Sequence, residues 1–120
     1  MEKKQLLHKF YPRGIEHFVM CCYDRHFWSA CLEFLGFSQI KGSQYSQDKK
    51  ISILRWGNIN IRLIDPETRD TDLDIAQRLV RFGDMQICRV AITIDSIQYA
   101  LDELEHYPFI RHTSVYSGID

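Results

Sequence analysis

The chain has 120 residues, of which 45% are hydrophobic and 12% aromatic, which excludes disorder and suits one domain with a single core. Fifteen basic residues nearly balance sixteen acidic ones, so neither nucleic acid nor an anionic membrane surface is expected as a partner. The apolar runs are too short to span a membrane, and the first ten residues lack the apolar centre of a secretion signal. The expected location is therefore cytoplasmic. The four cysteines contain no Cys-x-x-Cys pair, which disfavours a zinc ribbon and favours buried free thiols.

Residues 1–13 are basic and predict a weakly helical arm that ends at Pro12 and Gly14. The stretch GIEHFVMCC, residues 14–22, predicts a first strand, with His17, Val19 and Cys21 on one face and Cys22 on the other. A helix is expected over residues 25–35, with Asp24 as its cap and Gly36 as its end. Its apolar positions follow the helical spacing and are expected to face the core or an interface: Phe27, Cys31, Phe34 and Leu35.

Three strands are predicted after this helix. Residues 37–46 read as a polar edge strand, and residues 49–56 and 59–65 as two strands joined by the turn Gly57-Asn58. The first half of the chain therefore has the order βαβββ.

The second half repeats the beginning of that order. A helix over 71–82, capped by Thr71, leads to a strand over 85–95, a helix over 97–107 and a last candidate strand over 109–118. The predicted class is α+β. Its organisation is an arm of residues 1–13 followed by a single domain, 14–120. That domain consists of unit one (14–66), a connecting helix (67–84) and a partial unit two (85–120), which lacks a two-strand hairpin.

This order resembles the vicinal oxygen chelate superfamily of glyoxalases, bleomycin-resistance proteins and extradiol dioxygenases. GIEHFVMCCYDRHFWSACLEFLGF is similar to the opening strand, helix and Leu-Gly-Phe ending of that superfamily. LRWGNINIRLIDP, and DIAQRLVRFGD followed by RVAITID, resemble the N-terminal domain of 4-hydroxyphenylpyruvate dioxygenase. The resemblance covers residues 14–107 and implies paired βαβββ units with a functional concave sheet face.

The resemblance also implies where metal ligands would lie, typically a His on the first strand of a unit and a carboxylate on the fourth. His17 falls at the first-strand His, Arg62 at the fourth-strand carboxylate, and Arg89 where the second unit's strand would begin with His. An arginine stays protonated and has no lone pair to offer a cation. We therefore expect a degenerate site, with no metal ligand, no cofactor and no catalytic residue. In the dioxygenase the iron is held by the C-terminal domain, so such a site fits the resemblance.

His17, Arg62, Arg89 and His112 are the predicted ligand-binding residues. If they converge, they form a cationic pocket suited to a small carboxylate or a phosphate. The alternative is that each arginine extends into solvent or pairs with a local acid such as Asp65, Asp84 or Glu16.

Three functions remain open on the sequence. The first is a non-catalytic dioxygenase-like domain that binds a small carboxylate. The second is a metal-dependent dioxygenase or glyoxalase-type enzyme whose ligands are completed by a partner chain, for example His17 with His112 and a partner's acid. The third is a structural dimerisation module.

The incomplete second unit would leave strand edges unpaired, so we expect a two-fold homodimer in which residues 85–120 contribute most of the buried surface. The competing expectation is a monomer whose residues 1–13 cover that edge.

Overall fold

The computed structural model describes residues 12–42, 44–69 and 72–94, together with Gln98, Asp102 and Glu105. The chain divides into two compact units, Ile15–Ala91 and Met1–Gly14 with Ile92–Asp120, and the first holds nearly all of the described elements. The expected arm over 1–13 and the expected last strand over 109–118 lie outside the described residues, apart from Pro12 and Arg13. In the expected helix over 97–107, Gln98 and Asp102 are helical, and the Gln98 amide donates to the Asp102 carboxylate at 2.9 Å.

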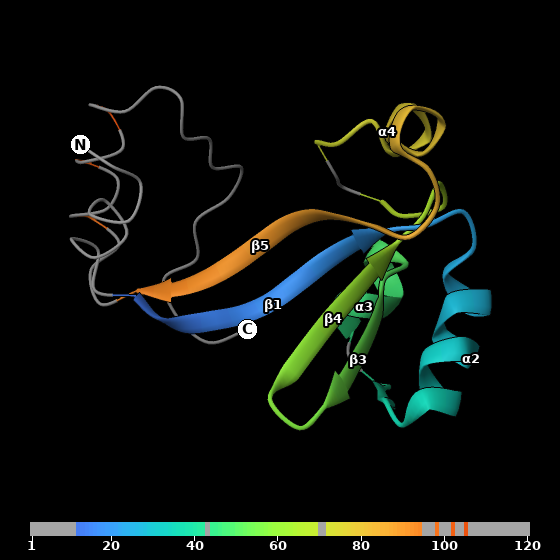
Figure 1. Cartoon of the computed structure of the whole chain (residues 1–120), viewed down its shortest axis with the longest axis horizontal. Coiled ribbons are helices and arrows are strands. Elements are labelled where there is room, and N and C mark those ends of the chain that lie inside the picture. The colour runs from blue at the N-terminus through green and yellow to red at the C-terminus, as the bar shows by residue number, and fades with distance from the viewer. Residues whose placement is uncertain are drawn as a thin grey trace. The chain divides into compact units, whose positions relative to one another are not determined.

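The observed elements confirm the predicted α+β class and the βαβββ order of the first unit (Figure 1). A short helix, α3, is added before the third strand, and a connecting helix and one further strand follow the fourth. In chain order the elements are β1 (Pro12–Cys21), α2 (Arg25–Leu35), β2 (Ser38–Ile40), α3 (Gln44–Lys49), β3 (Ser52–Trp56), β4 (Ile59–Ile64), α4 (Ile75–Phe82) and β5 (Gln86–Ile94).

The five strands form one mixed sheet in the order β2-β3-β4-β1-β5. β1 and β4 pair in parallel, with Met20 opposite Leu63, whereas β3 is antiparallel to both β2 and β4, with Leu54 opposite Ile61. A parallel neighbour requires a crossover connection, and α2 with the strands after it provides the crossover from β1 to β4. β5 lies on the other side of β1 and runs in the opposite direction (Figure 1).

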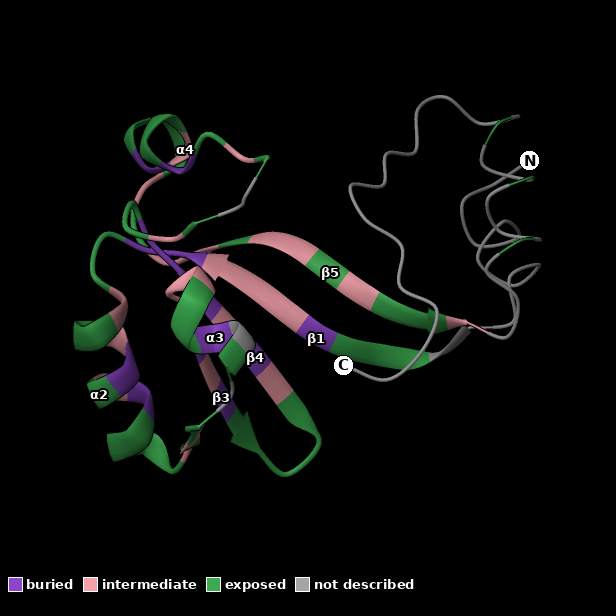
Figure 2. Ribbon diagram, turned by 180° about the vertical axis from the view of Figure 1, so that it is seen from behind, coloured by how far each residue is buried: buried purple, intermediate pink, exposed green. Residues whose placement is uncertain are grey.

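Two apolar clusters lie on the two faces of this sheet. Cys21 and Cys22 are adjacent in sequence and both fully buried, yet they belong to different clusters, as the alternation of a strand predicts. The first cluster joins the sheet to α2 and contains Cys22, Leu32, Leu54, Ile61 and Leu63. The second joins the sheet to α4 and contains Cys21, Ile64, Ile75 and Leu79. Figure 2 shows the buried residues on the inner side of α2 and along β3 and β4.

The predicted limits of α2 are confirmed. Of the two roles expected for Phe27 and Phe34, in the core or at an interface, the structure excludes the core, because both side chains are exposed. Asp24 accepts hydrogen bonds from two N–H groups of the first turn, and Gly36 ends the helix with a positive φ of 122°. The buried residues of the helix are Ser29 and Leu32, and Phe34 is 91% exposed. The helix has two apolar stripes, and its periodicity does not indicate which of them faces the sheet.

The polar strand expected over 37–46 is also wrong beyond its first few residues. Only Ser38–Ile40 pairs with β3, and Gln44–Lys49 is helical. Gly42 has a positive φ of 87°, which breaks the extended conformation. The α3 helix that follows is stabilised by a hydrogen bond from the Gln44 amide to Asp48 at 2.8 Å, one helical turn away.

α4 begins four residues later than predicted. Its cap is Asp74, whose carboxylate accepts from the Gln77 N–H at 3.1 Å, whereas the predicted cap, Thr71, lies outside the described residues. Its end is as predicted, because the Gly83 N–H donates to the Leu79 carbonyl at 2.9 Å.

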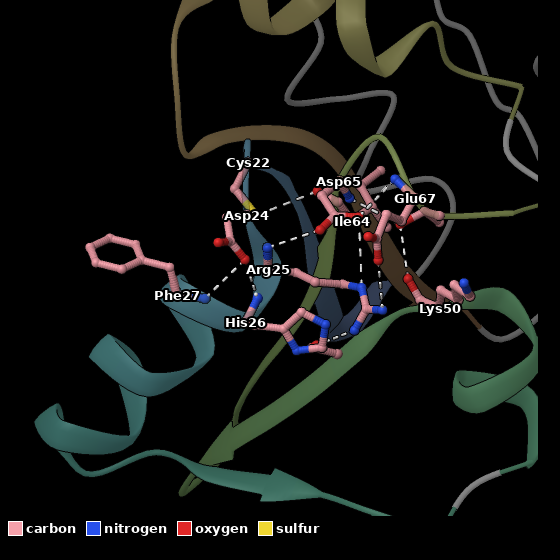
Figure 3. A network of polar contacts seen from close by, with 11 residues as sticks. Cys22, Asp24, Arg25, His26, Phe27, Lys50, Ile64, Asp65 and Glu67 are labelled. Carbon is pink, nitrogen blue, oxygen red and sulfur yellow. Dashed lines mark hydrogen bonds and ion pairs between the residues drawn. The ribbon is translucent and has the colours of Figure 1, made fainter.

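Asp65, which is only 3% exposed, joins three segments that are far apart in the sequence (Figure 3). One carboxylate oxygen accepts from the N–H of Arg25 at the start of α2, and the other accepts from the N–H of Glu67, both at 3.0 Å. The Arg25 guanidinium lies 3.7 Å from the same carboxylate. The Asp65 N–H donates to the Thr68 hydroxyl, which in turn donates to the Lys50 carbonyl before β3. These contacts fix the start of α2 against the end of β4.

We expect Asp65→Ala to lower the free energy of unfolding by about 3 kcal/mol, because it removes the carboxylate beside a buried guanidinium and leaves two backbone N–H groups without their acceptor. Urea unfolding followed by circular dichroism measures this loss. Asp48→Ala is the matched control, since Asp48 is exposed and makes one side-chain hydrogen bond within α3. Its effect should stay within about 0.5 kcal/mol. Equal effects of the two substitutions would contradict the role given to Asp65.

Candidate functional site

The sheet face opposite α2 carries the predicted residues His17 and Arg62. Arg62 on β4 is paired with Val19 on β1 and with Ile53 on β3. Paired residues lie on the same face, and His17 shares the face of Val19 because the two are two positions apart on one strand. α4 covers the end of this face near Cys21, where Ile75 and Leu79 pack. We call the remainder, defined by His17, Val19, Ile53, Asn60 and Arg62, the basic sheet face.

His17 is 6% exposed, and its Nδ1 contacts the carboxylate of Glu16. An ionised carboxylate has no proton to donate and can only accept a hydrogen bond. In the neutral imidazole ring, Nδ1 is therefore the nitrogen that carries the proton. Nε2 then carries the lone pair and is free of that contact. The imidazole of His17 is therefore a buried ring with a local acceptor on one nitrogen.

A ladder of hydrogen bonds crosses the basic sheet face beside His17. The Arg55 guanidinium donates to the Asn60 side-chain oxygen at 2.8 Å, and the Asn60 amide donates to the Glu16 carbonyl at 3.1 Å. These bonds connect β3, β4 and β1. The sequence analysis did not single out Asn60 or Arg55, although Asn60 is two positions from Arg62 on one strand and could have been placed on the same face.

Arg62 lies at the centre of the sheet and is partly buried. Its neighbours across the strands, Val19 and Ile53, are apolar and also partly buried. The face therefore offers a cation between two aliphatic side chains, an arrangement that suits an anion with a small apolar body.

Arg89 forms an ion pair with the carboxylate of Asp72. Its guanidinium donates to the Asp72 carboxylate and holds the pKa of that carboxyl below its usual value, while its Nε is buried without a hydrogen bond. This is the pairing with a local acid that the sequence left open, although Asp72 was not among the acids named. His112 lies outside the described residues. The structure thus brings His17 and Arg62 to one face, and the convergence of all four residues remains a prediction.

The thiols of Cys21 and Cys88 hydrogen-bond to each other between the neighbouring strands β1 and β5. The Cys88 thiol also lies 3.3 Å from the Val19 carbonyl. The hydrogen bond from Cys88 lowers the pKa of Cys21 against the opposing effect of burial, and the charges of Arg78 and Arg89 lower it further. The same bond, together with burial, raises the pKa of Cys88. All four cysteines lie in the described part of the chain and are free thiols.

The donor set of the basic sheet face does not fit a divalent cation. His17 offers one lone pair, whereas the guanidinium of Arg62 offers none and adds a positive charge. Among the residues that the structure describes, no group of three or more His, Cys, Asp or Glu side chains is placed to hold a metal ion.

No helix in the described segments is long and apolar enough to cross a membrane.

Comparison with known proteins relates this chain to others through its fold. No family model matches the sequence, and no curated protein matches it. The structure is similar to methylmalonyl-CoA epimerase from Mycobacterium tuberculosis, with a TM-score of 0.59 and 19% identity over 81% of this chain and 65% of the epimerase. It is also similar to the hypothetical protein BH1468 from Bacillus halodurans C-125, with a TM-score of 0.54 and 18% identity over 77% of this chain and 66% of that protein.

These comparisons show a fold of the vicinal oxygen chelate type, as the resemblance of the sequence implied. At such low identity they show the fold alone. The matches span slightly less than two thirds of each of those proteins.

Cys22 provides a test of the buried end of β1. Its thiol lies 3.5 Å from the Ile64 carbonyl, and burial, followed by the charges of Asp65 and Asp84, raises its pKa from 9.0 to about 12. Above pH 9 the thiol ionises in the unfolded chain but stays protonated in the folded one. Its contribution to the free energy of unfolding is therefore complete below pH 9 and is lost as the pH rises towards 12. The loss is about 1.4 kcal/mol per pH unit.

We therefore expect the unfolding free energy to fall more steeply between pH 8 and pH 10.5 in the wild type than in Cys22→Ala. Urea titrations of both proteins at each pH measure the two slopes. Parallel slopes would show that the thiol of Cys22 ionises as readily in the folded chain as in the unfolded one.

Proposed function

We propose that this chain is a non-catalytic domain of the vicinal oxygen chelate type, similar in role to the N-terminal domain of 4-hydroxyphenylpyruvate dioxygenase, that binds a small carboxylate. The observation that carries the proposal is Arg62, a cation on the sheet face where the superfamily places an anionic metal ligand. His17, on the same face, supplies a second polar group, whose Nδ1 contacts Glu16.

The chemistry of the basic sheet face favours a carboxylate over a metal-bound oxygen. A guanidinium presents parallel N–H groups that match the two oxygens of a carboxylate, and partial burial strengthens such a pair. Val19 and Ile53 flank Arg62 and would contact the carbon skeleton of the ligand. A small aliphatic or aromatic carboxylate therefore fits better than a phosphate, which has no apolar body.

Arg89 and His112 complete the proposed pocket. Arg89 has to exchange or share its carboxylate partner, Asp72, in order to reach a ligand. Because Asp72 is exposed, that pair is weakly held, and exchange with a ligand carboxylate is nearly neutral in energy. Arg62, which lies between two aliphatic side chains on the basic sheet face, is the principal anchor in this proposal, and Arg89 contributes less.

We expect small carboxylates such as phenylpyruvate to bind with dissociation constants no better than several hundred micromolar, since one charge-assisted pair contributes about 1.5–3 kcal/mol. NMR titration of the full chain measures the affinity and maps the shifted residues. Arg62→Ala should abolish binding, and Arg89→Ala should weaken it. Arg81→Ala on the exposed side of α4 is the matched control and should bind like the wild type. Unchanged affinity in Arg62→Ala would remove the basis of the proposal.

The second candidate is a metal-dependent dioxygenase or glyoxalase-type enzyme whose ligands a partner chain completes. The observation in its favour is His17, buried on the first strand with its Nδ1 held by Glu16, as a metal-binding imidazole requires of its second nitrogen. The occurrence of this fold in an epimerase is also compatible with catalysis.

The proposed binding role predicts that protein purified without chelator carries no stoichiometric iron, manganese, zinc or nickel, because Arg62 stands at a ligand position. Elemental analysis by mass spectrometry measures this directly. Addition of Fe(II) and 4-hydroxyphenylpyruvate should give no oxygen consumption. One equivalent of bound metal that is lost in His17→Ala would favour the enzyme instead.

A further inference from the structure

The outer surface of α2 is apolar along its whole length. Phe27 is 57% exposed, Leu35 is 64% exposed, and Phe34 is the most exposed of the three. Together with Ala30 and Cys31 they line an open hollow of about 440 Å³. We call these five residues the α2 stripe.

The α2 stripe has the pattern of a helix-packing seam. Phe27, Ala30, Cys31 and Phe34 recur at positions i, i+3, i+4 and i+7, which place them on one side of the helix. The opposite side already packs on the sheet through Ser29 and Leu32. A helix at the surface of a domain normally presents polar residues there, and apolar area left in water costs about 25 cal/mol per Å².

We propose that the α2 stripe binds the same stripe of a second copy of this chain, with the two helices antiparallel. Four residues of the stripe are symmetric about its centre, with the small residues Ala30 and Cys31 in the middle and Phe27 and Phe34 on either side. A two-fold axis between Ala30 and Cys31 brings the small residues together and allows the helices to approach closely. The same axis places Phe27 against the partner's Phe34, and Phe34 against the partner's Phe27.

The polar side chains beside the stripe favour a second copy in the antiparallel orientation. His26 and Glu33 are seven residues apart and lie along the same edge of the stripe, near its opposite ends. In an antiparallel pair related by a two-fold axis, this edge meets the same edge of the partner. His26 therefore faces the partner's Glu33, and Glu33 faces the partner's His26. A parallel pair would instead bring this edge against the apolar edge formed by Leu35, and it would also align the helix dipoles unfavourably.

The length of α2 sets the strength of this contact. Eleven residues span about 16 Å, so the seam buries far less than the roughly 800 Å² per partner of a stable complex. We expect a dissociation constant between about 10 μM and 1 mM. This interface differs from the one expected from the sequence, which used residues 85–120. In that segment the described part of β5 exposes three apolar residues, Ile87, Val90 and Ile92. A substitution among them tests whether the dimer forms through β5 instead of through the α2 stripe.

Sedimentation equilibrium of the full chain from 5 μM to 1 mM should show a reversible monomer–dimer equilibrium. Phe34→Glu should weaken it more than tenfold, because it places two carboxylates in the seam. Two controls replace apolar residues that are exposed elsewhere: Val80→Glu on α4 and Ile87→Lys on β5. Both should dimerise like the wild type. A chain that stays monomeric at 1 mM, or a dimer that is lost in Ile87→Lys and kept in Phe34→Glu, would overturn the proposal.

A charge exchange tests the orientation without endangering the fold. His26→Glu sets a carboxylate against the partner's Glu33 and should raise the dissociation constant of the dimer about fivefold. The double variant His26→Glu, Glu33→Lys sets opposite charges against each other and should return the dissociation constant to within twofold of the wild type. Both substitutions favour helix α2 itself, since an acid at its first turn and a base at its last turn complement the dipole. Circular dichroism checks the fold. Equal dimerisation of the single and double variants would exclude the antiparallel pairing.

Cys31 gives an independent measure of the same geometry. It lies next to the proposed axis and is partly exposed, whereas Cys21 and Cys22 are fully buried. Cys88 is also partly buried, but it lies on β5, away from the stripe, and its thiol donates to the Val19 carbonyl. A bis-maleimide with a two-carbon spacer adds one thiolate to each of its double bonds and should link two wild-type chains. The link should disappear in Cys31→Ser and decrease in Phe34→Glu. A link that persists in Cys31→Ser would contradict this arrangement.

Discussion

The buried carboxylate of Asp65 determines how α2 sits on the sheet. It accepts the backbone N–H of Arg25 and lies beside the Arg25 guanidinium, so the first turn of the helix is fixed to the end of β4. Asp84 adds a second restraint, since its carboxylate accepts from the Trp28 indole at 3.0 Å and from the Tyr23 N–H at 2.9 Å. With the helix held at these points it cannot rotate about its axis, and the side bearing Leu32 faces the sheet. The exposed α2 stripe is a consequence of this arrangement.

The opposite face of the sheet is shaped by the parallel pairing of β1 with β4. This pairing brings His17 and Arg62 to one surface although they are 45 positions apart in the sequence (62 − 17). Partial burial between aliphatic neighbours makes Arg62 a stronger partner for an anion than an exposed arginine. In a sheet of the vicinal oxygen chelate type, a guanidinium at this position suits the binding of an anion better than the holding of a metal, and this difference separates the proposed domain from the metal-dependent enzymes of that superfamily.

Much of the fold follows from short-range patterns. Alternation along residues 14–22 predicts that Cys21 and Cys22 pack on opposite faces, and the clusters on either side of the sheet confirm it. Asp24 acts locally through hydrogen bonds to its own side chain, and Gly36 and Gly57 act through positive φ values that the absence of a side chain permits. The errors have a different origin. The polar sequence of α3 has no apolar period that would distinguish a helix from a strand, and α2 has two stripes of similar hydrophobicity, either of which could face the core.

The sequence by itself determined the βαβββ order, the cap and end of α2, the turn between β3 and β4, and the presence of arginines at positions where the resemblance implies metal ligands. These features depend on residues close together in the chain, whose propensities and periodicity can be read directly. Only the tertiary structure decided which side of α2 is buried, that His17 and Arg62 share a face with the Arg55–Asn60 ladder, and that Arg89 pairs with Asp72. Each of these depends on contacts between segments far apart in the sequence, such as the hydrogen bonds of Asp65 and the register of β1 on β4, which no local pattern encodes.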